Sequence, residues 1–150
     1  MESSGLAIRP LARADRAGWG RLWEHYLAFY ETTRPASYFD AYFERLLSGD
    51  AHDYHCLLAV VDRPVGLAHY CLHAHGWQAE PVCYLQDLFV DPATRGTGTG
   101  RALIERVYVN ADGRGAKGVY WTTQHFNAAG RRLYDRVGEL TPFIKYQRPS

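Results

Sequence analysis

The residues that decide the fold are Val90-Asp91-Pro92-Ala93-Thr94-Arg95-Gly96-Thr97-Gly98-Thr99-Gly100-Arg101-Ala102-Leu103. Three glycines alternate here between a strand-like and a helix-like stretch. Such a loop can cradle an anion, because glycine lets a ligand approach the backbone and the N–H groups at a helix start carry a positive dipole end. The flanking Arg95 and Arg101 suit phosphate oxygens. The stretch 95–101 therefore predicts a site for a phosphate-bearing ligand.

Two common nucleotide-binding motifs do not fit this loop. A P-loop needs Lys followed by Ser or Thr after its last glycine, where this chain has Arg101-Ala102. A dinucleotide fingerprint needs its third glycine at position 101, which is Arg, and an acidic residue about twenty positions further on. The residues found there are Gly118 to Trp121. The ligand must be recognised through a different motif.

The hydrophobic pattern around the loop alternates between the periods of strands and helices. Apolar residues three and four apart predict helices after Asp15 as far as Tyr30, over 37–47 with Ser37 as the cap, over 98–112, and over 127–137 with Asn127 as the cap. Strands are predicted at 6–11, 54–61, 65–75, 82–90, 119–123 and 143–147. This order predicts a mixed α/β sheet, mostly antiparallel, in a single domain spanning 1–150.

Composition excludes several classes of protein. The 150 residues are 47% hydrophobic and 22% charged, as in globular domains, and the formal net charge of +1 gives no field that attracts nucleic acid or membrane. The longest apolar run, 56–61, is too short to span a bilayer, and no secretion signal precedes Pro10. Three widely spaced cysteines do not suggest a disulfide framework. We expect a cytoplasmic protein without nucleic-acid or membrane partners.

Two segments carry a family resemblance. The stretch 90–103 resembles motif A of the GNAT superfamily, the CoA-dependent N-acetyltransferases, and Asn127-Ala128-Ala129-Gly130-Arg131-Arg132-Leu133-Tyr134-Asp135-Arg136-Val137-Gly138 resembles motif B. The stretches 54–59 and 84–90 are similar to the diamine and polyamine acetyltransferases and to the small histone and D-amino-acid acetyltransferases. The resemblance implies a GNAT fold, in which a twisted sheet flanked by helices splays between strands 82–90 and 119–123 to admit acetyl-CoA.

The resemblance also implies roles for individual residues. A backbone N–H of Leu88 or Phe89 would polarise the thioester carbonyl, as in an oxyanion hole. Tyr134 matches the motif B tyrosine that acts as general acid toward the departing thiolate. The residues implied in cofactor binding are Leu88, Phe89, Val90, Arg95, Gly96, Thr97, Gly98, Thr99, Gly100, Arg101, Asn127 and Gly130.

The acceptor amine must lose a proton before it attacks, because an alkylammonium has a pKa of about 10. Asp87 lies beside the cofactor stretch and is the first candidate to bind the ammonium or to take its proton through water. The polyamine branch often has Glu where this chain has Gln86, and an amide does not titrate, which weakens polyamine specificity. Tyr30 and Glu31 match a pair that holds the amine in that branch, and an aromatic core contact beside a solvated carboxylate is the alternative. Arg34 could receive a substrate carboxylate.

Strand alternation puts His69, Cys71, His73 and His75 on one face. These are metal-ligand residue types, but zinc sites usually draw ligands from more than one element, and amine acetylation needs no metal. We expect no metal site, and His69 is interpreted as lining the acceptor pocket, where it could be an alternative base. The cysteines are interpreted as buried structural thiols, which favours direct transfer in a ternary complex over an acetyl-enzyme.

The predicted function is transfer of the acetyl group of acetyl-CoA to a primary amine of a small molecule, such as a diamine, polyamine or amino acid. A protein or histone lysine is the alternative acceptor, and a non-catalytic CoA-binding sensor is the alternative of another class. The general base remains open among Asp87, His69 and water. Because the strand expected at 143–147 would lack partners in one copy, and relatives pair or exchange such strands, we expect a homodimer.

Overall fold

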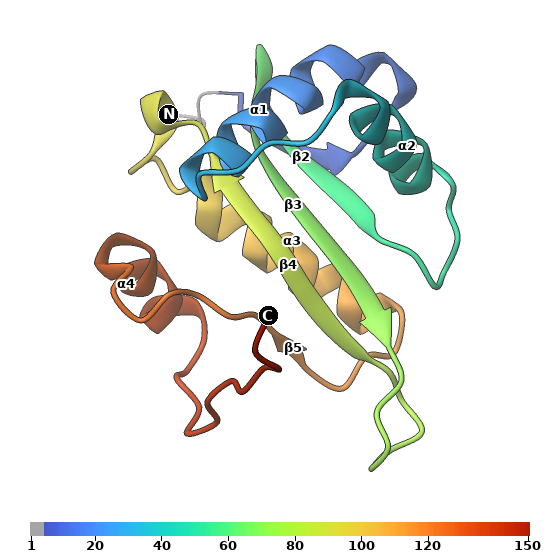
Figure 1. The fold of residues 1–150 in the computed structure, drawn as a ribbon, viewed down its shortest axis with the longest axis vertical. Helices are drawn as coiled ribbons and strands as arrows, with labels where there is room; N and C mark the ends of the chain where they lie inside the picture. The colour runs from blue at the N-terminus through green and yellow to red at the C-terminus, as the bar shows by residue number, and fades with distance from the viewer. Residues whose placement is uncertain (1–4) are drawn as a thin grey trace.

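The computed structural model describes residues 5–150, which build one five-stranded sheet in the order β1-β2-β3-β4-β5 (Figure 1). The strands are β1 Ala7–Pro10, β2 His55–Val61, β3 Arg63–His73, β4 Val82–Val90 and β5 Val119–Tyr120. The first four pair antiparallel, and β5 runs parallel to β4. A parallel neighbour needs a crossover, which α3 provides. The predicted mixed, mostly antiparallel sheet is confirmed.

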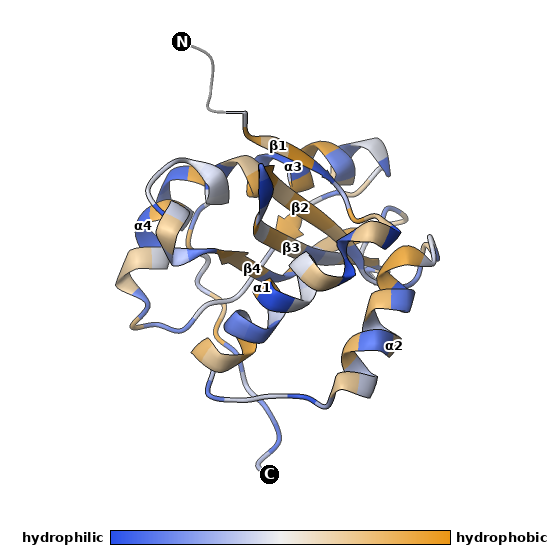
Figure 2. Ribbon diagram, turned by 90° about the horizontal axis from the view of Figure 1, so that it is seen from above, coloured by the Kyte–Doolittle hydropathy of each residue, from blue (hydrophilic) through white to orange (hydrophobic). Residues whose placement is uncertain are grey.

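Helices cover both faces of the sheet, as Figure 2 shows. Helices α1 Arg16–Phe29 and α2 Ala36–Leu47 lie on one face, while α3 Thr99–Gly113 and α4 Ala128–Val137 lie on the other, and the short 3-10 turns are Arg13–Asp15 and Pro92–Thr94. Each face has its own core, one built on Trp19 and Phe43 and the other on Leu103 and Ile104. The expected cap at Ser37 is wrong, because α2 begins one residue earlier with Pro35 at the N-cap.

The sheet opens between β4 and β5. The two strands pair at Cys83 with Val119 and at Tyr84 with Tyr120, after which the chain leaves the sheet toward α4 (Figure 1). Strand β5 is therefore shorter than the expected 119–123, and the ring of Trp121, the next residue, packs 5.6 Å from that of Tyr134. Along residues 85–90, β4 has no paired strand on this side within the described part of the chain. This opening is the splay that the sequence predicts.

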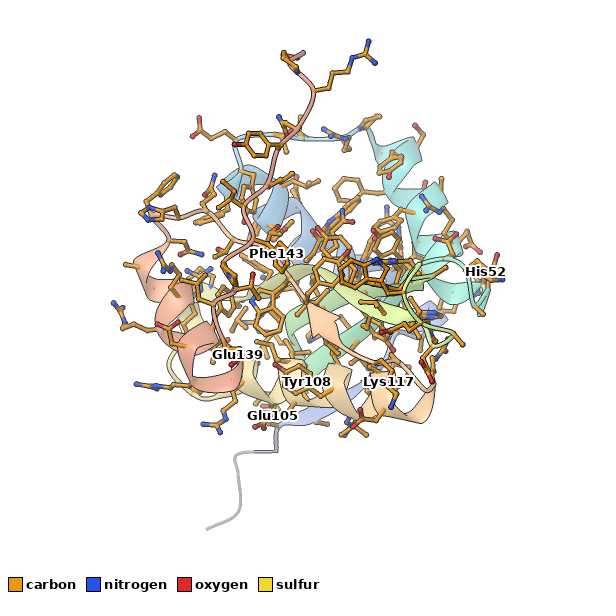
Figure 3. All side chains as sticks on the ribbon, turned by 90° about the horizontal axis from the view of Figure 1, so that it is seen from below. His52, Glu105, Tyr108, Lys117, Glu139 and Phe143 are labelled. Carbon is orange, nitrogen blue, oxygen red and sulfur yellow. The ribbon has the colours of Figure 1, made fainter. Side chains whose placement is uncertain are left out.

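The strand expected at 143–147 is not formed. No helix or strand follows α4 in the described residues, and the side chains of Phe143, Ile144 and Tyr146 are exposed. Figures 2 and 3 show the end of the chain projecting away from the sheet, and Figure 3 labels Phe143. Alternating apolar residues form a strand when an edge is available to pair with, and β5 offers an edge of two residues. No described helix is long and apolar enough to cross a bilayer.

Candidate active site

The glycine loop forms an open cradle at the start of α3. Gly96 and Gly98 have φ values of 83° and 85°, in the left-handed region that favours glycine, and Gly98 is the N-cap of α3. A Cβ on Gly100 would lie 3.1 Å from Leu133 Cδ2, so this glycine lets α4 pack closely. Among residues 5–150, no backbone carbonyl accepts from the N–H groups of 96–101. These donors remain available to an anion, as a helix N-terminus allows.

The two arginines border this cradle. Arg95 Nε donates to the carbonyl of Val90 at 3.0 Å, and its guanidinium lies 5.6 Å from the Phe89 ring centroid. Arg101 Nε donates to Glu105 at 3.1 Å, one turn along α3. Both side chains are exposed, and each arginine carries further N–H donors. Together they add positive charge at both ends of the glycine loop.

A β-bulge in β4 decides where Asp87 lies. In the β3–β4 ladder, His69 is paired with Asp87 and Tyr70 with Leu85, so Gln86 is an extra residue without a partner. Leu85 packs in the core under α3, and without the bulge Asp87 would face the same side because strand side chains alternate. The extra residue turns Asp87 toward α1 instead. The sequence pattern predicts Asp87 beside the stretch 88–90 but does not reveal this bulge.

Asp87 is buried, with 6% of its surface exposed, and it hydrogen-bonds within the core. Its Oδ2 lies 2.9 Å from Nδ1 of His69, while the indole Nε1 of Trp19 donates to Nε2 of the same ring at 3.0 Å. His69 is completely buried, so both of its ring nitrogens meet protein groups rather than solvent. The structure thus brings His69 and Asp87 together and adds Trp19, a buried residue of α1.

Uncharged tyrosines surround this carboxylate. Burial raises the pKa of Tyr26 above its ordinary range, and the negative charge of Asp87 raises it further. Tyr42 on α2 has its pKa raised for the same two reasons. The ring of Tyr26 lies 5.1 Å from that of Tyr30 and 6.2 Å from that of Phe89, which joins the end of α1 to the open part of β4. A positively charged amine would meet one carboxylate and several aromatic faces here.

The other residues expected to bind the acceptor lie at the rim of this region. Tyr30 is 42% exposed at the end of α1, and Glu31 follows it, exposed and in the left-handed conformation with φ 57°. Gln86 is exposed on the bulge and accepts a hydrogen bond from the Tyr54 hydroxyl. Arg34 instead donates to Thr32 and to the Thr33 carbonyl.

Tyr134 lies on α4, half-buried, and packs against the core on the α3 side of the sheet. Burial raises the pKa of its phenol, and the neighbouring Tyr30 raises it further, so the hydroxyl keeps its proton at neutral pH. At the start of the same helix, Asn127 Oδ1 accepts from the N–H of Gly130 at 3.2 Å and Nδ2 donates to Thr123 at 3.0 Å. Asn127 and Gly130 thus form the N-terminal cap that positions α4.

The remaining histidines of the predicted face lie at the surface, whereas burial affects all three cysteines. His73 Nε2 lies 2.9 Å from the hydroxyl of Tyr120, at the surface, and His75 accepts from the N–H of Trp77. Among the described residues, no group of three or more His, Cys, Asp or Glu side chains could hold a metal ion. The cysteines are free, and burial raises the pKa of Cys56, Cys71 and Cys83, the last to about 12. None is activated as a thiolate nucleophile.

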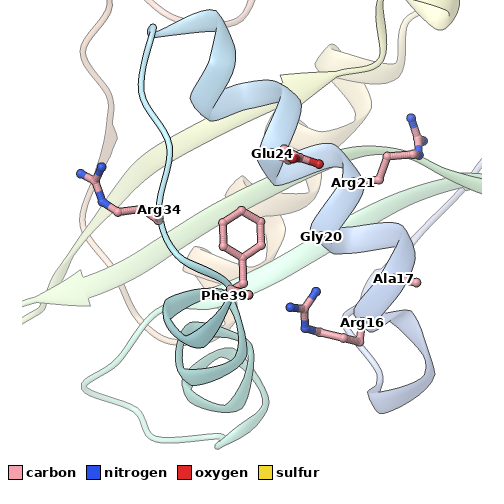
Figure 4. Close-up of a pocket in the computed structure, with 8 residues that line it drawn as sticks. Arg16, Ala17, Gly20, Arg21, Glu24, Arg34 and Phe39 are labelled. Carbon is pink, nitrogen blue, oxygen red and sulfur yellow. The ribbon is translucent and has the colours of Figure 1, made fainter.

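A hollow of about 390 Å³ lies between α1 and the start of α2 (Figure 4). It is open to solvent, and its lining residues are Arg16, Ala17, Gly20, Arg21, Glu24, Arg34, Ala36 and Phe39. Arg16 is paired with Asp40 and Arg21 with Asp91, so two of its three arginines already have carboxylate partners. Of the residues that the sequence suggests for the acceptor, only Arg34 lies here.

The model of the acetyltransferase (GNAT) family matches residues 19–138, which include the cradle, the bulge and α4. The chain belongs to the GNAT family. It is therefore an acyltransferase, an N-acetyltransferase of a family that uses acetyl-CoA. A D-amino-acid N-acetyltransferase of Saccharomyces cerevisiae, HPA3, is 32% identical over 150 residues, covering 99% of this chain and 93% of the yeast protein.

Solved structures of GNAT proteins share the whole fold. A ribosomal-protein-alanine N-acetyltransferase from Brucella melitensis superposes with a TM-score of 0.80 at 23% identity, covering 97% of this chain and 99% of that one. The structure of AAC(6')-Iy with the bisubstrate analogue CoA-S-monomethyl-acetylneamine has a TM-score of 0.82 at 21% identity, with 97% and 98% covered. At these identities the likeness supports the GNAT fold and leaves the acceptor open.

Proposed function

We propose that this GNAT protein transfers the acetyl group of acetyl-CoA to a primary amine of a small molecule by direct attack in a ternary complex. The observation that carries the proposal is the buried Asp87 carboxylate, which the bulge turns toward α1 beside the unpaired part of β4. Opposite charges attract strongly where water is scarce, so this carboxylate suits a substrate ammonium. Diamines, polyamines and amino acids all carry such a group.

The unpaired donors of the chain fit the cofactor. The N–H groups of 96–101, together with Arg95 and Arg101, would bind its pyrophosphate, and the free edge at Leu88 to Val90 would contact the pantetheine arm. When bound, acetyl-CoA supplies the acetyl group as a thioester. An N–H of Leu88 or Phe89 would then hydrogen-bond to the carbonyl oxygen, where negative charge develops.

Two protons must move during the reaction. Asp87 holds the ammonium and accepts its proton, either directly or through water, so that the neutral amine can attack. The Tyr134 hydroxyl, which stays protonated at neutral pH, donates its proton to the departing sulfur and recovers one from the attacking nitrogen, which must lose a second proton to become an amide. The buried thiols do not take part, because burial keeps Cys56 and Cys83 protonated. The acetyl group therefore passes to the amine without an acetyl-cysteine.

Among the small amines, the chain favours an amino acid over a polyamine. Gln86 brings no second carboxylate beside Asp87, and its side chain is occupied by the Tyr54 hydroxyl. The further positive charges of a polyamine would find no carboxylate on Gln86, so they would add little to the attraction of the first ammonium. The 32% identity to a yeast D-amino-acid N-acetyltransferase points in the same direction.

Release of free CoA thiol tests this function. The purified chain is offered acetyl-CoA with D- and L-amino acids, diamines, polyamines and a lysine-rich peptide, and we expect the highest kcat/KM with an amino acid. Asp87→Asn should raise the amine KM much more than the CoA dissociation constant. Turnover confined to the peptide would refute the small-molecule assignment, and CoA binding without any turnover would support a sensor instead.

We also propose that the protein is a homodimer. The exposed apolar side chains Leu140, Phe143, Ile144 and Tyr146 follow α4, and a second copy of the same segment would give them a partner. Light scattering of the full chain should give twice 17.1 kDa, and Ile144→Lys should shift the mass toward the monomer. A monomeric parent protein would refute this. The three free thiols suit the reducing cytoplasm, which is the location we propose.

A further inference from the structure

The hydrogen bonds around His69 determine which of its nitrogens carries the proton. An indole N–H can only donate, so Nε2 of His69, 3.0 Å from Trp19 Nε1, must be the acceptor. The remaining nitrogen, Nδ1, then carries the hydrogen and donates it to Asp87 Oδ2 at 2.9 Å. This arrangement is satisfied by a neutral imidazole and an ionised carboxylate. A doubly protonated ring would set two N–H groups, on Nε2 and on Trp19, against each other.

The second indole of this core provides a contrast. Trp23 stacks on Trp19 with ring centroids 5.3 Å apart and is also buried, yet its Nε1 has no hydrogen-bond partner among the described residues. Burial of an indole in this core therefore does not by itself provide a hydrogen-bond partner, and the bond between Trp19 and His69 is a separate feature. It joins α1 to β3 through residues fifty positions apart, and it ends on the carboxylate of the acceptor region.

The other groups around this pair do not supply charge near neutral pH. The titratable side chains that face Asp87 and His69 are phenols and one thiol, which are ordinarily uncharged at pH 7. They come from α1, α2, the start of β2 and the loop before it: Tyr26, Tyr42, Tyr54 and Cys56. The charge of the site at neutral pH therefore depends on the imidazole and the carboxylate alone.

We propose that Trp19 and His69 are positioning residues that keep Asp87 ionised and oriented for the substrate ammonium. The Trp19 N–H occupies the lone pair of Nε2, so the one N–H of the neutral His69 ring is on Nδ1 and is directed at Asp87. His69 uses Oδ2 of Asp87, and Oδ1, which makes no hydrogen bond to the imidazole, would receive the amine. This role rests on the proposed function, in which Asp87 binds the ammonium, and it gives His69 a part other than that of a base.

Nuclear magnetic resonance tests the hydrogen-bond assignment without any substrate. In protein labelled with 15N-histidine, long-range proton–nitrogen correlations should show His69 as the neutral Nδ1–H form across pH 6 to 8. Trp23→Phe, the matched control, should give the same pattern. Trp19→Phe, which removes the donor, should show protonation at Nε2 toward the acidic end. Wild-type protein with hydrogen on Nε2, or a Trp19→Phe spectrum identical to wild type, would overturn the assignment.

Kinetics tests the role of this arrangement in amine binding. Relative to wild type at the same pH, Trp19→Phe should raise the amine KM by about tenfold more at pH 6.5 than at pH 8.5, because a protonated His69 cancels the charge that attracts the amine. The kcat at saturating amine and the CoA dissociation constant should change little. Trp23→Phe should show no such pH dependence. Equal effects of the two variants on the amine KM at both pH values would show that Trp19 contributes packing only and would refute its positioning role.

Two substitutions of the histidine separate hydrogen bonding from filling space. His69→Asn keeps an N–H near the position of Nδ1 and should hold the amine KM within about threefold of wild type, whereas His69→Leu should raise it more than about tenfold. Equal KM values in the two variants would refute the positioning role. If the spectra bear out the Nδ1–H form but Asp87→Asn leaves the amine KM unchanged, the proposed function fails while the hydrogen-bond assignment stands.

Discussion

Two tyrosines flank Trp121, and we expect the hydroxyl of one to affect stability and the hydroxyl of the other to affect catalysis. The ring centroids of Tyr108 and Tyr134 lie 6.3 and 5.6 Å from that of Trp121. The Tyr108 hydroxyl, on the residue labelled in Figure 3, donates to the carbonyl of Val137 and so ties α3 to the end of α4. The Tyr134 hydroxyl has no hydrogen-bond partner among residues 5–150. One hydroxyl therefore serves the fold, while the other is available to the reaction.

The magnitudes follow from these partners. Tyr108→Phe removes one hydrogen bond and leaves the Val137 carbonyl unpaired, which costs about 1 kcal/mol of unfolding free energy and lowers Tm by about 3 °C, with kcat unchanged. Tyr134→Phe removes the proposed proton donor and should lower kcat by about 10² to 10⁴. Because its hydroxyl makes no hydrogen bond within the described residues, Tm and the CoA dissociation constant should stay at the wild-type values.

Three measurements on the same samples decide the matter: thiol release at saturating substrates for kcat, differential scanning calorimetry for Tm, and calorimetric titration with CoA. A Tyr134→Phe enzyme with kcat within about threefold of wild type would refute the general-acid assignment. A drop in kcat accompanied by an equal loss of Tm would attribute the effect to damage of α4. An active but destabilised Tyr108→Phe enzyme shows that the assay separates the two roles.

Three further outcomes are expected. Asn127→Ala should lower the unfolding free energy in urea by about 1 kcal/mol through loss of the α4 cap, and an unchanged CoA dissociation constant would separate that cap from cofactor binding. Gly98→Ala places a side chain at φ 85° and should cost about 1 to 2 kcal/mol and weaken CoA binding, whereas Gly113→Ala, in open space at the end of α3, should do neither in the same titrations. The hydrogen bond from Arg9 lowers the pKa of Asp15, and the hydrogen bond from a backbone N–H of the turn that Asp91 caps lowers the pKa of Asp91. Each carboxylate therefore adds stability that is complete above its unfolded pKa of about 4 and is lost as the pH falls. The urea midpoint should therefore decline from pH 5 to pH 3 and decline less in Asp91→Asn; a parallel decline in that variant would contradict the sign argued for Asp91.

The parts of the fold that the sequence predicts are those with local causes. Alternating glycines before a helical pattern identify the cradle. Gly96 and Gly98 adopt positive φ values because glycine has no side chain, and this property can be read from the residue alone. The helices follow from apolar spacing within single segments. The strand expected at 143–147 fails for the opposite reason, since a strand needs an edge to pair with, and a pattern of apolar residues does not show whether that edge exists.

The acceptor region depends on contacts that a sequence pattern does not reveal. The bulge at Gln86 appears when β4 is set against β3, and it decides which side of the sheet Asp87 faces. Likewise, Trp19 fits a helical stripe as well as any core residue, and its bond to His69 spans fifty positions of the chain. From the sequence, His69 is expected to act as a base or to line the acceptor pocket. Its tautomer becomes evident only when the Trp19 indole is seen to face it.

The two cores lie on opposite faces of the sheet, and the residues proposed to bind the two substrates divide between these faces. The residues proposed to face the acceptor come from the α1 and α2 side of the sheet, while the cradle and Tyr134 come from the α3 and α4 side, and the two groups meet along the open half of β4. Substitutions on the inner surfaces of α1 and α2 can therefore reshape the choice of amine without touching the residues proposed to hold CoA. A library restricted to those surfaces is a direct route to new acceptors, and a family built this way can diversify its substrates while one half of each molecule stays constant.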